Sequence, residues 1–112
     1  VEAAHKCGAD IVELHTGTYC HAFHDGDEAR MNDELARLQQ AAQMADRLGL
    51  EVHAGHGLCF DTVGPIAAIP SMVELNIGHF LIGEAIFIGL EAAIIKMREL
   101  MQAARAQAMA QS

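Results

Sequence analysis

Three times along this chain, a short β-rich run is followed by a loop bearing glycine and histidine and then by a helical pattern. The runs occupy residues 10–16, 51–55 and 72–77. Strict alternation of strand and helix predicts a parallel sheet with right-handed crossover connections. The candidate architectures are therefore a doubly wound α/β sheet and a part of a (β/α)₈ barrel.

The segments between the runs show helical periodicity and recognisable ends. We expect helices at residues 1–6, 27–48 and 61–68, and in two consecutive stretches from about residue 80 to 106. The long helix begins with acidic residues and ends at Gly49, as the helix dipole and the C-cap favour. Its apolar stripe contains Leu35, Leu38, Ala41, Ala42 and Ala45. The histidine-rich segment 18–27 is predicted to be a loop, and residues 107–112 a fraying tail.

Ionisable and polar residues on two strands distinguish between the two architectures. Side chains alternate along a strand, so Glu13 and His15 share one face, and so do Glu74 and Asn76. An open sheet covered by helices on both faces would be apolar throughout. A barrel interior, where polar groups gather near the catalytic mouth, fits this pattern better. We therefore expect residues 1–112 to be about three βα units from the C-terminal part of one (β/α)₈ TIM-barrel domain.

Composition excludes several classes of protein. Seven Lys and Arg against fifteen Asp and Glu give a net charge of −8 without a basic cluster, so a nucleic-acid groove is not expected. A 52% hydrophobic content argues against disorder. The apolar stretch 77–95 is interrupted by His79, Glu84 and Glu91, which favours a packed helix over a membrane span.

The cysteines and the start of the chain suggest where the protein works and what it belongs to. Cys7, Cys20 and Cys59 are an odd number at no repeating spacing, which favours a reducing, cytoplasmic compartment over a disulfide framework. The chain opens inside a helical pattern at Val1, without an initiator Met or signal-type segment. We take it to be a piece of a longer protein.

Unusual residues follow each predicted strand, at the end where functional groups gather in α/β folds. His56 lies between Gly55 and Gly57, so its backbone can approach a ligand and its ring can exchange a proton near neutral pH. The alternative is a ring that only caps a strand-end carbonyl. Glu13 is a candidate for stabilising cationic charge, or else for pairing with a basic residue elsewhere.

Gly78 and His79 precede a helix, whose free N–H groups and positive dipole end suit a phosphate. A simple turn requiring glycine is the alternative. Cys20, His21 and His24 raise the question of a metal, but their spacing fits no structural zinc pattern. No GxGxxG or GxxxxGK[ST] motif is present, which weakens nucleotide-binding alternatives.

Four motifs in order carry a specific family resemblance: ELHTG at 13–17, AGHGL at 54–58, IAAIP at 66–70 and ELNIGH at 74–79. Over residues 1–104 the chain resembles the C-terminal half of the pyridoxine 5′-phosphate synthase family. The resemblance implies a (β/α)₈ barrel that condenses 3-amino-2-oxopropyl phosphate with 1-deoxy-D-xylulose 5-phosphate. The products are pyridoxine 5′-phosphate, inorganic phosphate and water, and no metal or organic cofactor takes part.

Position by position, the resemblance makes His56 a proton donor and Glu13 a stabiliser of the transition state. Gly57, Gly78 and His79 correspond to positions that bind the phosphorylated amino ketone. Further acid–base residues and an arginine for the second phosphate belong to earlier strands, which this chain lacks. For the full-length protein we expect a cytoplasmic homo-oligomer that binds neither nucleic acid nor membrane.

Two other functions remain open. One is a different phosphate-handling barrel enzyme, such as an isomerase or an aldolase; a Schiff-base aldolase would need a strand-end lysine, and neither Lys6 nor Lys96 is so placed. The other is a non-catalytic half-barrel. Made alone, the 112-residue chain is expected to lack synthase activity, since three parallel strands leave two open edges and unpaired apolar stripes. We expect it to self-associate, or to refold with recovery of activity when the missing half is added.

Overall fold

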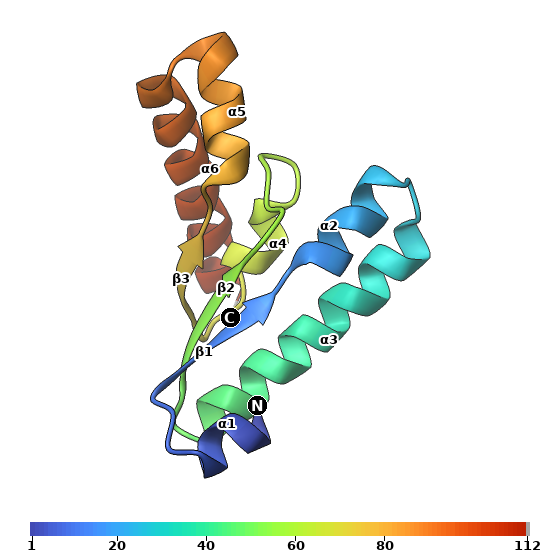
Figure 1. Cartoon of the computed structure of the whole chain (residues 1–112), viewed down its shortest axis with the longest axis vertical. Coiled ribbons are helices and arrows are strands. Elements are labelled where there is room, and N and C mark those ends of the chain that lie inside the picture. The colour runs from blue at the N-terminus through green and yellow to red at the C-terminus, as the bar shows by residue number, and fades with distance from the viewer. Residues whose placement is uncertain (112) are drawn as a thin grey trace.

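The computed structural model describes residues 1–111 and is an α/β fold around a three-stranded parallel sheet. The strands are β1 (Ile11–His15), β2 (Glu51–Gly55) and β3 (Met72–Asn76), in the spatial order β1-β2-β3 (Figure 1). The three predicted strands and their parallel arrangement are thus confirmed. All three carboxyl ends lie at one edge of the sheet, as parallel strands require.

An irregularity in β3 decides which of its side chains share a face. Val52 of β2 pairs with Met72, but the next residue, His53, pairs with Glu74, so Val73 is an extra residue in the ladder. A bulge of this kind shifts the alternation by one position. It leaves Met72 on the helix-covered face and turns Glu74 toward the same face as His53. The predicted common face of Glu74 and Asn76 is therefore present.

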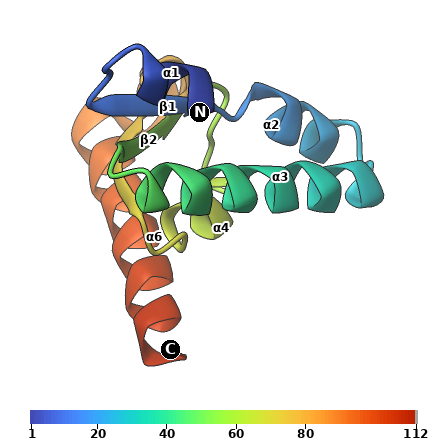
Figure 2. The ribbon, with the colours of Figure 1, turned by 90° about the horizontal axis from the view of Figure 1, so that it is seen from below.

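Helices cover one face of the sheet (Figure 2). The long helix α3 (Glu28–Arg47) packs on β1 and β2, the short helix α4 (Val63–Ala67) packs on β3, and α6 (Leu90–Ala110) lies against α4. The first helix, α1 (Glu2–Lys6), precedes β1. The core between these layers is aliphatic, and its fully buried members include Val52, Leu58, Val63 and Ile66.

The boundaries of α3 match the prediction because its signals are local. Asp27 is the N-cap and its carboxylate accepts a hydrogen bond from the Arg30 N–H at 3.1 Å. Gly49, with φ of +77°, follows the last turn in the left-handed conformation that favours glycine. The predicted apolar stripe is also confirmed: Ala42 and Ala45 are buried, and the remaining members pack against the core.

Two predictions about irregular segments were wrong. The segment expected to be a loop contains helix α2 (Gly17–His24), because Tyr19, Cys20 and Ala22 are buried against the rest of the protein and stabilise the helix. The C-terminal tail does not fray after residue 106, since α6 continues to Ala110. The Arg105 guanidinium anchors its last turns by donating to the backbone carbonyls of Ala67, Ile69 and Pro70 at 3.2, 2.6 and 2.8 Å.

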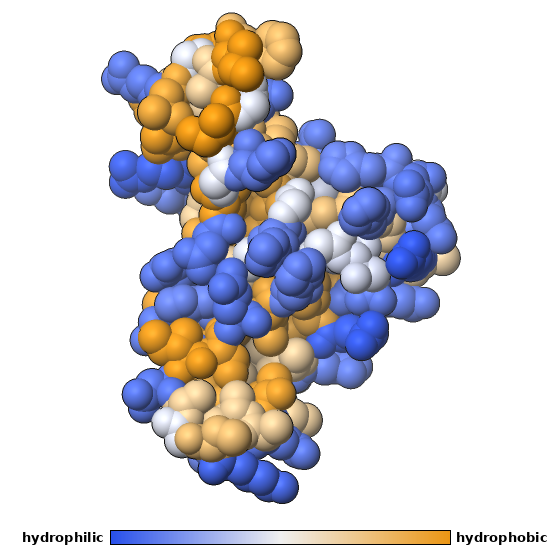
Figure 3. Space-filling view, viewed as in Figure 1, coloured by the Kyte–Doolittle hydropathy of each residue, from blue (hydrophilic) through white to orange (hydrophobic). Residues whose placement is uncertain are grey.

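Helix α5 (His79–Ile88) differs from the other long helices. None of its residues is buried in the part of the chain that the structure describes, and Ile86 and Phe87 are 80% and 83% exposed. The orange surface at the top of Figure 3 lies over this helix and the start of α6. Gly89 separates the two helices with φ of +84° and ψ of 151°, a conformation that residues with a Cβ avoid.

Within residues 1–111, no helix has the length and apolar character needed to cross a membrane.

Candidate functional site

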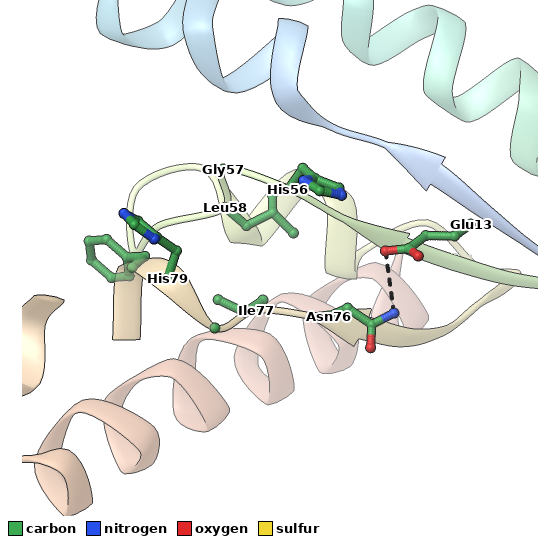
Figure 4. Close-up of a pocket in the computed structure, with 9 residues that line it drawn as sticks. Glu13, His56, Gly57, Leu58, Asn76, Ile77 and His79 are labelled. Carbon is green, nitrogen blue, oxygen red and sulfur yellow. Dashed lines mark hydrogen bonds between the residues drawn. The ribbon is translucent and has the colours of Figure 1, made fainter. Parts of the chain in front are cut away.

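A cavity of about 560 Å³ opens at the carboxyl edge of the sheet (Figure 4). Every site residue predicted from the sequence lines it: Glu13, His56, Gly57, Gly78 and His79. Leu58, Asn76, Ile77 and Phe80 complete the wall. The residues come from β1, from the loop after β2, and from β3 together with the start of α5. Segments more than sixty residues apart in sequence thus meet at one place, while the role of each residue stays a prediction.

The Glu13 carboxylate crosses over the neighbouring strand. Its Oε1 atom lies above Gly55, where a Cβ atom would collide with it, and it accepts a hydrogen bond from the Asn76 amide nitrogen at 3.4 Å. Glu13 thus reaches from β1 across β2 to β3, as the dashed line in Figure 4 shows. The missing side chain at Gly55 leaves room for the Glu13 carboxylate to pass over β2.

His56 has an unusual backbone. Its φ is +82°, a left-handed value that residues with a Cβ rarely adopt, and Gly57 follows with φ of +80°. Thr16 supports this conformation: its buried hydroxyl lies 2.7 Å from the Gly55 carbonyl oxygen and 2.6 Å from that of His56. Sequence reasoning assigned the unusual backbone to the glycines, whereas the structure extends it to the histidine itself. The result is an imidazole displayed at the mouth of the cavity.

Gly78 is the N-cap residue of α5, and no side chain caps this helix. The first backbone N–H groups of α5 therefore lack a capping side chain, and Gly78, His79 and Phe80 at this end of the helix line the cavity. A Cβ built on Gly78 would meet no described atom within 4 Å, so packing within residues 1–111 does not require glycine at this position. This observation weakens the alternative of a glycine kept for steric reasons in a simple turn.

The cysteine and histidine residues of α2 do not converge on one point. Cys20 is buried, and its Sγ lies 3.8 Å from the Thr62 hydroxyl, whereas His21 and His24 are exposed. Burial raises the pKa of the Cys20 thiol, so the protonated form is favoured. Among residues 1–111 there is no group of three or more His, Cys, Asp or Glu side chains arranged to hold a metal ion.

Sequence reasoning missed two residues that shape the site, Asn76 and Thr16. Asn76 was placed on the correct face, but its bond to Glu13 depends on the bulge at Val73, which leaves no signal in the sequence. Thr16 looks like an ordinary strand-end residue. Its fully buried hydroxyl between two carbonyl oxygens is visible only when β1 and β2 are paired.

Comparison with known proteins gives a consistent result. The family model described as "Pyridoxal phosphate biosynthesis protein PdxJ" matches residues 1–103. A protein of Roseobacter denitrificans named pyridoxine 5′-phosphate synthase is 65% identical over 106 residues, which are 95% of this chain and 43% of that protein. Proteins with the same name from Ruegeria pomeroyi and Caulobacter vibrioides are 61% and 58% identical, over 95% and 96% of the chain. The chain thus spans less than half the length of these relatives.

Proposed function

The chain belongs to the PdxJ family of pyridoxal phosphate biosynthesis proteins, and from this membership we propose that it forms part of a pyridoxine 5′-phosphate synthase. The substrates would be 3-amino-2-oxopropyl phosphate and 1-deoxy-D-xylulose 5-phosphate, and the products pyridoxine 5′-phosphate, inorganic phosphate and water. One observation carries the proposal: five residues expected to serve this reaction line a single cavity at the carboxyl ends of three parallel strands.

We further propose that residues 1–112 are three βα units of a (β/α)₈ barrel. Within the described residues 1–111, the helices cover one sheet face, and the other face carries Glu13, His53 and Glu74 with no helix over it. Closing the sheet with further strands would put this face inside a barrel and leave no sheet edge. In such barrels the active site lies at the carboxyl ends of the strands, which is where the cavity lies.

The charges of the cavity residues indicate which part of the substrate each residue contacts. A carboxylate repels phosphate, so Glu13 suits the reacting carbons, where it would stabilise the iminium charge that develops during condensation. The phosphate of the amino ketone fits instead against the backbone N–H groups of Gly57, Gly78 and His79. His56 would donate protons to departing groups during the eliminations and ring closure. No step in this assignment requires a metal or an organic cofactor.

A chimera tests the proposal. This chain replaces the matching segment of the Roseobacter denitrificans synthase, which contributes the rest of the protein. We expect the chimera to form pyridoxine 5′-phosphate from the two substrates, and each piece alone to form none. A folded, soluble chimera that binds the amino ketone phosphate without forming product would contradict the proposed reaction. If it bound no phosphate ester at all, the alternative of a non-catalytic module would be favoured.

Self-association of the isolated chain is a separate expectation. On α5, the apolar side chains of Ile82, Ile86 and Phe87 are exposed. Within the described residues, β1 and β3 are also the outer strands of the sheet and have one unpaired edge each. Exposed apolar patches and unpaired strand edges both favour association between chains. Size-exclusion chromatography combined with amide hydrogen exchange checks it. A monomeric elution with strong protection of all three strands would contradict it.

A further inference from the structure

The ring of His56 stacks on the ring of His15, and we propose that His15 is a positioning residue that fixes the orientation of the His56 imidazole. The ring centroids are 4.3 Å apart and the ring planes differ by 16°. His15 ends β1 and pairs with Gly55 of β2, the residue that directly precedes His56. The inference rests on the proposed function, since it assigns a partner to the proposed proton donor.

His56 needs an external support because its neighbours in the chain provide none. Gly55 and Gly57 have no side chains to restrict the imidazole, and the backbone between them is in the left-handed conformation. Thr16 holds the carbonyl groups but not the ring. Among residues 1–111, the stack on His15 is the only hydrogen bond, ion pair or ring contact that the His56 side chain makes.

His15 is itself held in place. Its Nδ1 atom accepts a hydrogen bond from the Gly17 N–H at 3.1 Å, at the first residue of α2. A Cβ atom on Gly17 would collide with Cε1 of His15 and lie 2.9 Å from Nδ1, so glycine at this position makes room for the ring. The start of α2, the segment predicted to be a loop, thus holds the His15 ring on which His56 stacks.

The hydrogen bond also sets the form of the ring. The Gly17 N–H can donate only to an Nδ1 atom that carries no proton, so this bond selects the tautomer with its proton on Nε2. The pair is arranged as one ring held by α2 and one proposed proton donor stacked on it.

Three substitutions at His15 in the chimera separate support from chemistry. His15→Phe keeps a flat ring, His15→Asn keeps an acceptor for the Gly17 N–H, and His15→Ala keeps neither. We expect Ala and Asn to lower kcat by about 10- to 100-fold, because a poorly oriented catalytic group loses that much. We expect Phe to stay within about threefold of the parent, because its ring can still stack. KM for the amino ketone phosphate should change little in all three. His21→Ala, at an exposed histidine of α2, is the matched control and should match the parent.

Equal losses in the Phe and Ala variants would overturn the proposal, because a flat ring at this position would then not be enough to orient His56. Full activity of the Ala variant would overturn it as well. Crystal structures of the parent and Ala chimeras provide a readout independent of turnover: the His56 ring should occupy one position in the parent and leave it in the variant. If the parent chimera forms no product, the proposed function fails, but these structures still test whether His15 fixes the ring. An unmoved His56 ring in the Ala variant contradicts the inference.

Discussion

The two faces of the sheet differ sharply. On one face, Val52 and Ala54 are buried under the helices, together with Leu14 and Met72 from the flanking strands. On the other face, Glu13 and Glu74 are exposed and His53 is half-buried between the Glu51 and Glu74 carboxylates, at 2.7 and 4.0 Å. A single strand thus serves two purposes with alternate residues. The apolar face stabilises the fold, and the polar face supplies Glu13 and Asn76 to the candidate site.

Because the two faces differ in this way, we expect substitutions to change either the stability of the protein or its proposed activity, depending on the face. A change on the helix-covered face should alter the free energy of unfolding and leave the cavity intact. A change at the polar face or its carboxyl edge should alter turnover with little effect on stability. We expect this separation to hold in the chimera, where substitutions at His56, Ile66, Gly55 and Tyr19 should have effects of decreasing size.

Replacing His56 with asparagine should have the largest effect. His56→Asn removes the proposed proton donor but keeps a side chain that tolerates the left-handed conformation. We expect turnover to fall by roughly 10²- to 10⁴-fold, the usual contribution of a general acid, with an unchanged melting temperature. Steady-state kinetics and thermal unfolding measure both quantities. Near-parental kcat in a folded variant would remove His56 from the mechanism.

On the helix-covered side, Ile66→Ala should destabilise the protein without affecting the site. Ile66 is fully buried in α4, so truncation leaves a cavity and costs about 2–5 kcal/mol of unfolding free energy. Val73→Ala is the matched control, because Val73 is 66% exposed at the bulge and should cost less than about 0.5 kcal/mol. Denaturant titration gives both values. Similar losses in the two variants would show that the packing described for α4 is incorrect.

A methyl group at Gly55 should disturb Glu13 and its hydrogen-bond partner Asn76. Gly55→Ala places a Cβ where the Glu13 carboxylate now lies and 3.0 Å from the Asn76 carbonyl oxygen, so the carboxylate must move. We expect kcat to fall by about tenfold, the scale expected for a displaced charged group. In Gly64→Ala, a Cβ on α4 meets no described atom within 4 Å, and this control should retain activity. Parental activity in Gly55→Ala would show that the position of Glu13 is unimportant.

Tyr19 should make stability depend on pH only under alkaline conditions. Burial, with smaller contributions from Cys20 and Cys59, raises the pKa of Tyr19 to about 12, and its hydroxyl donates to the Thr62 carbonyl at 3.0 Å. Because the folded state holds this proton more tightly than the unfolded chain does, its stabilising contribution is complete below pH 10. It is lost as pH rises from 10 toward 12. Tyr19→Phe should flatten this part of the stability profile, and an unchanged slope would contradict the assignment.

Sequence reasoning succeeded where the signals are local. Asp27 and Gly49 delimit α3 to within a residue, and β-rich runs mark all three strands. We expected Glu13 of β1 to lie near His56 and His79, which follow β2 and β3, because parallel strands end at one edge. This rule brought them to one cavity without any knowledge of distances.

Sequence reasoning failed where contacts between residues far apart in the chain determine the local structure. Helix α2 depends on Tyr19 and Cys20 packing near Thr62, more than forty residues later, and its own sequence is a weak helix former. The bulge at Val73 is set by the register against β2. The stack of His15 on His56 also arises only when β1 and β2 are side by side. Such features cannot be read from periodicity or spacing.

The central claim is that the carboxyl edge of the polar face binds the phosphorylated amino ketone. A crystal structure of the chimera with 3-amino-2-oxopropyl phosphate tests it most directly. The account predicts the phosphate within about 3 Å of the backbone nitrogens of Gly78 and His79, with the carbon chain extending toward Glu13 and His56. A well-occupied ligand bound elsewhere, with those backbone N–H groups directed away from the cavity, would contradict it.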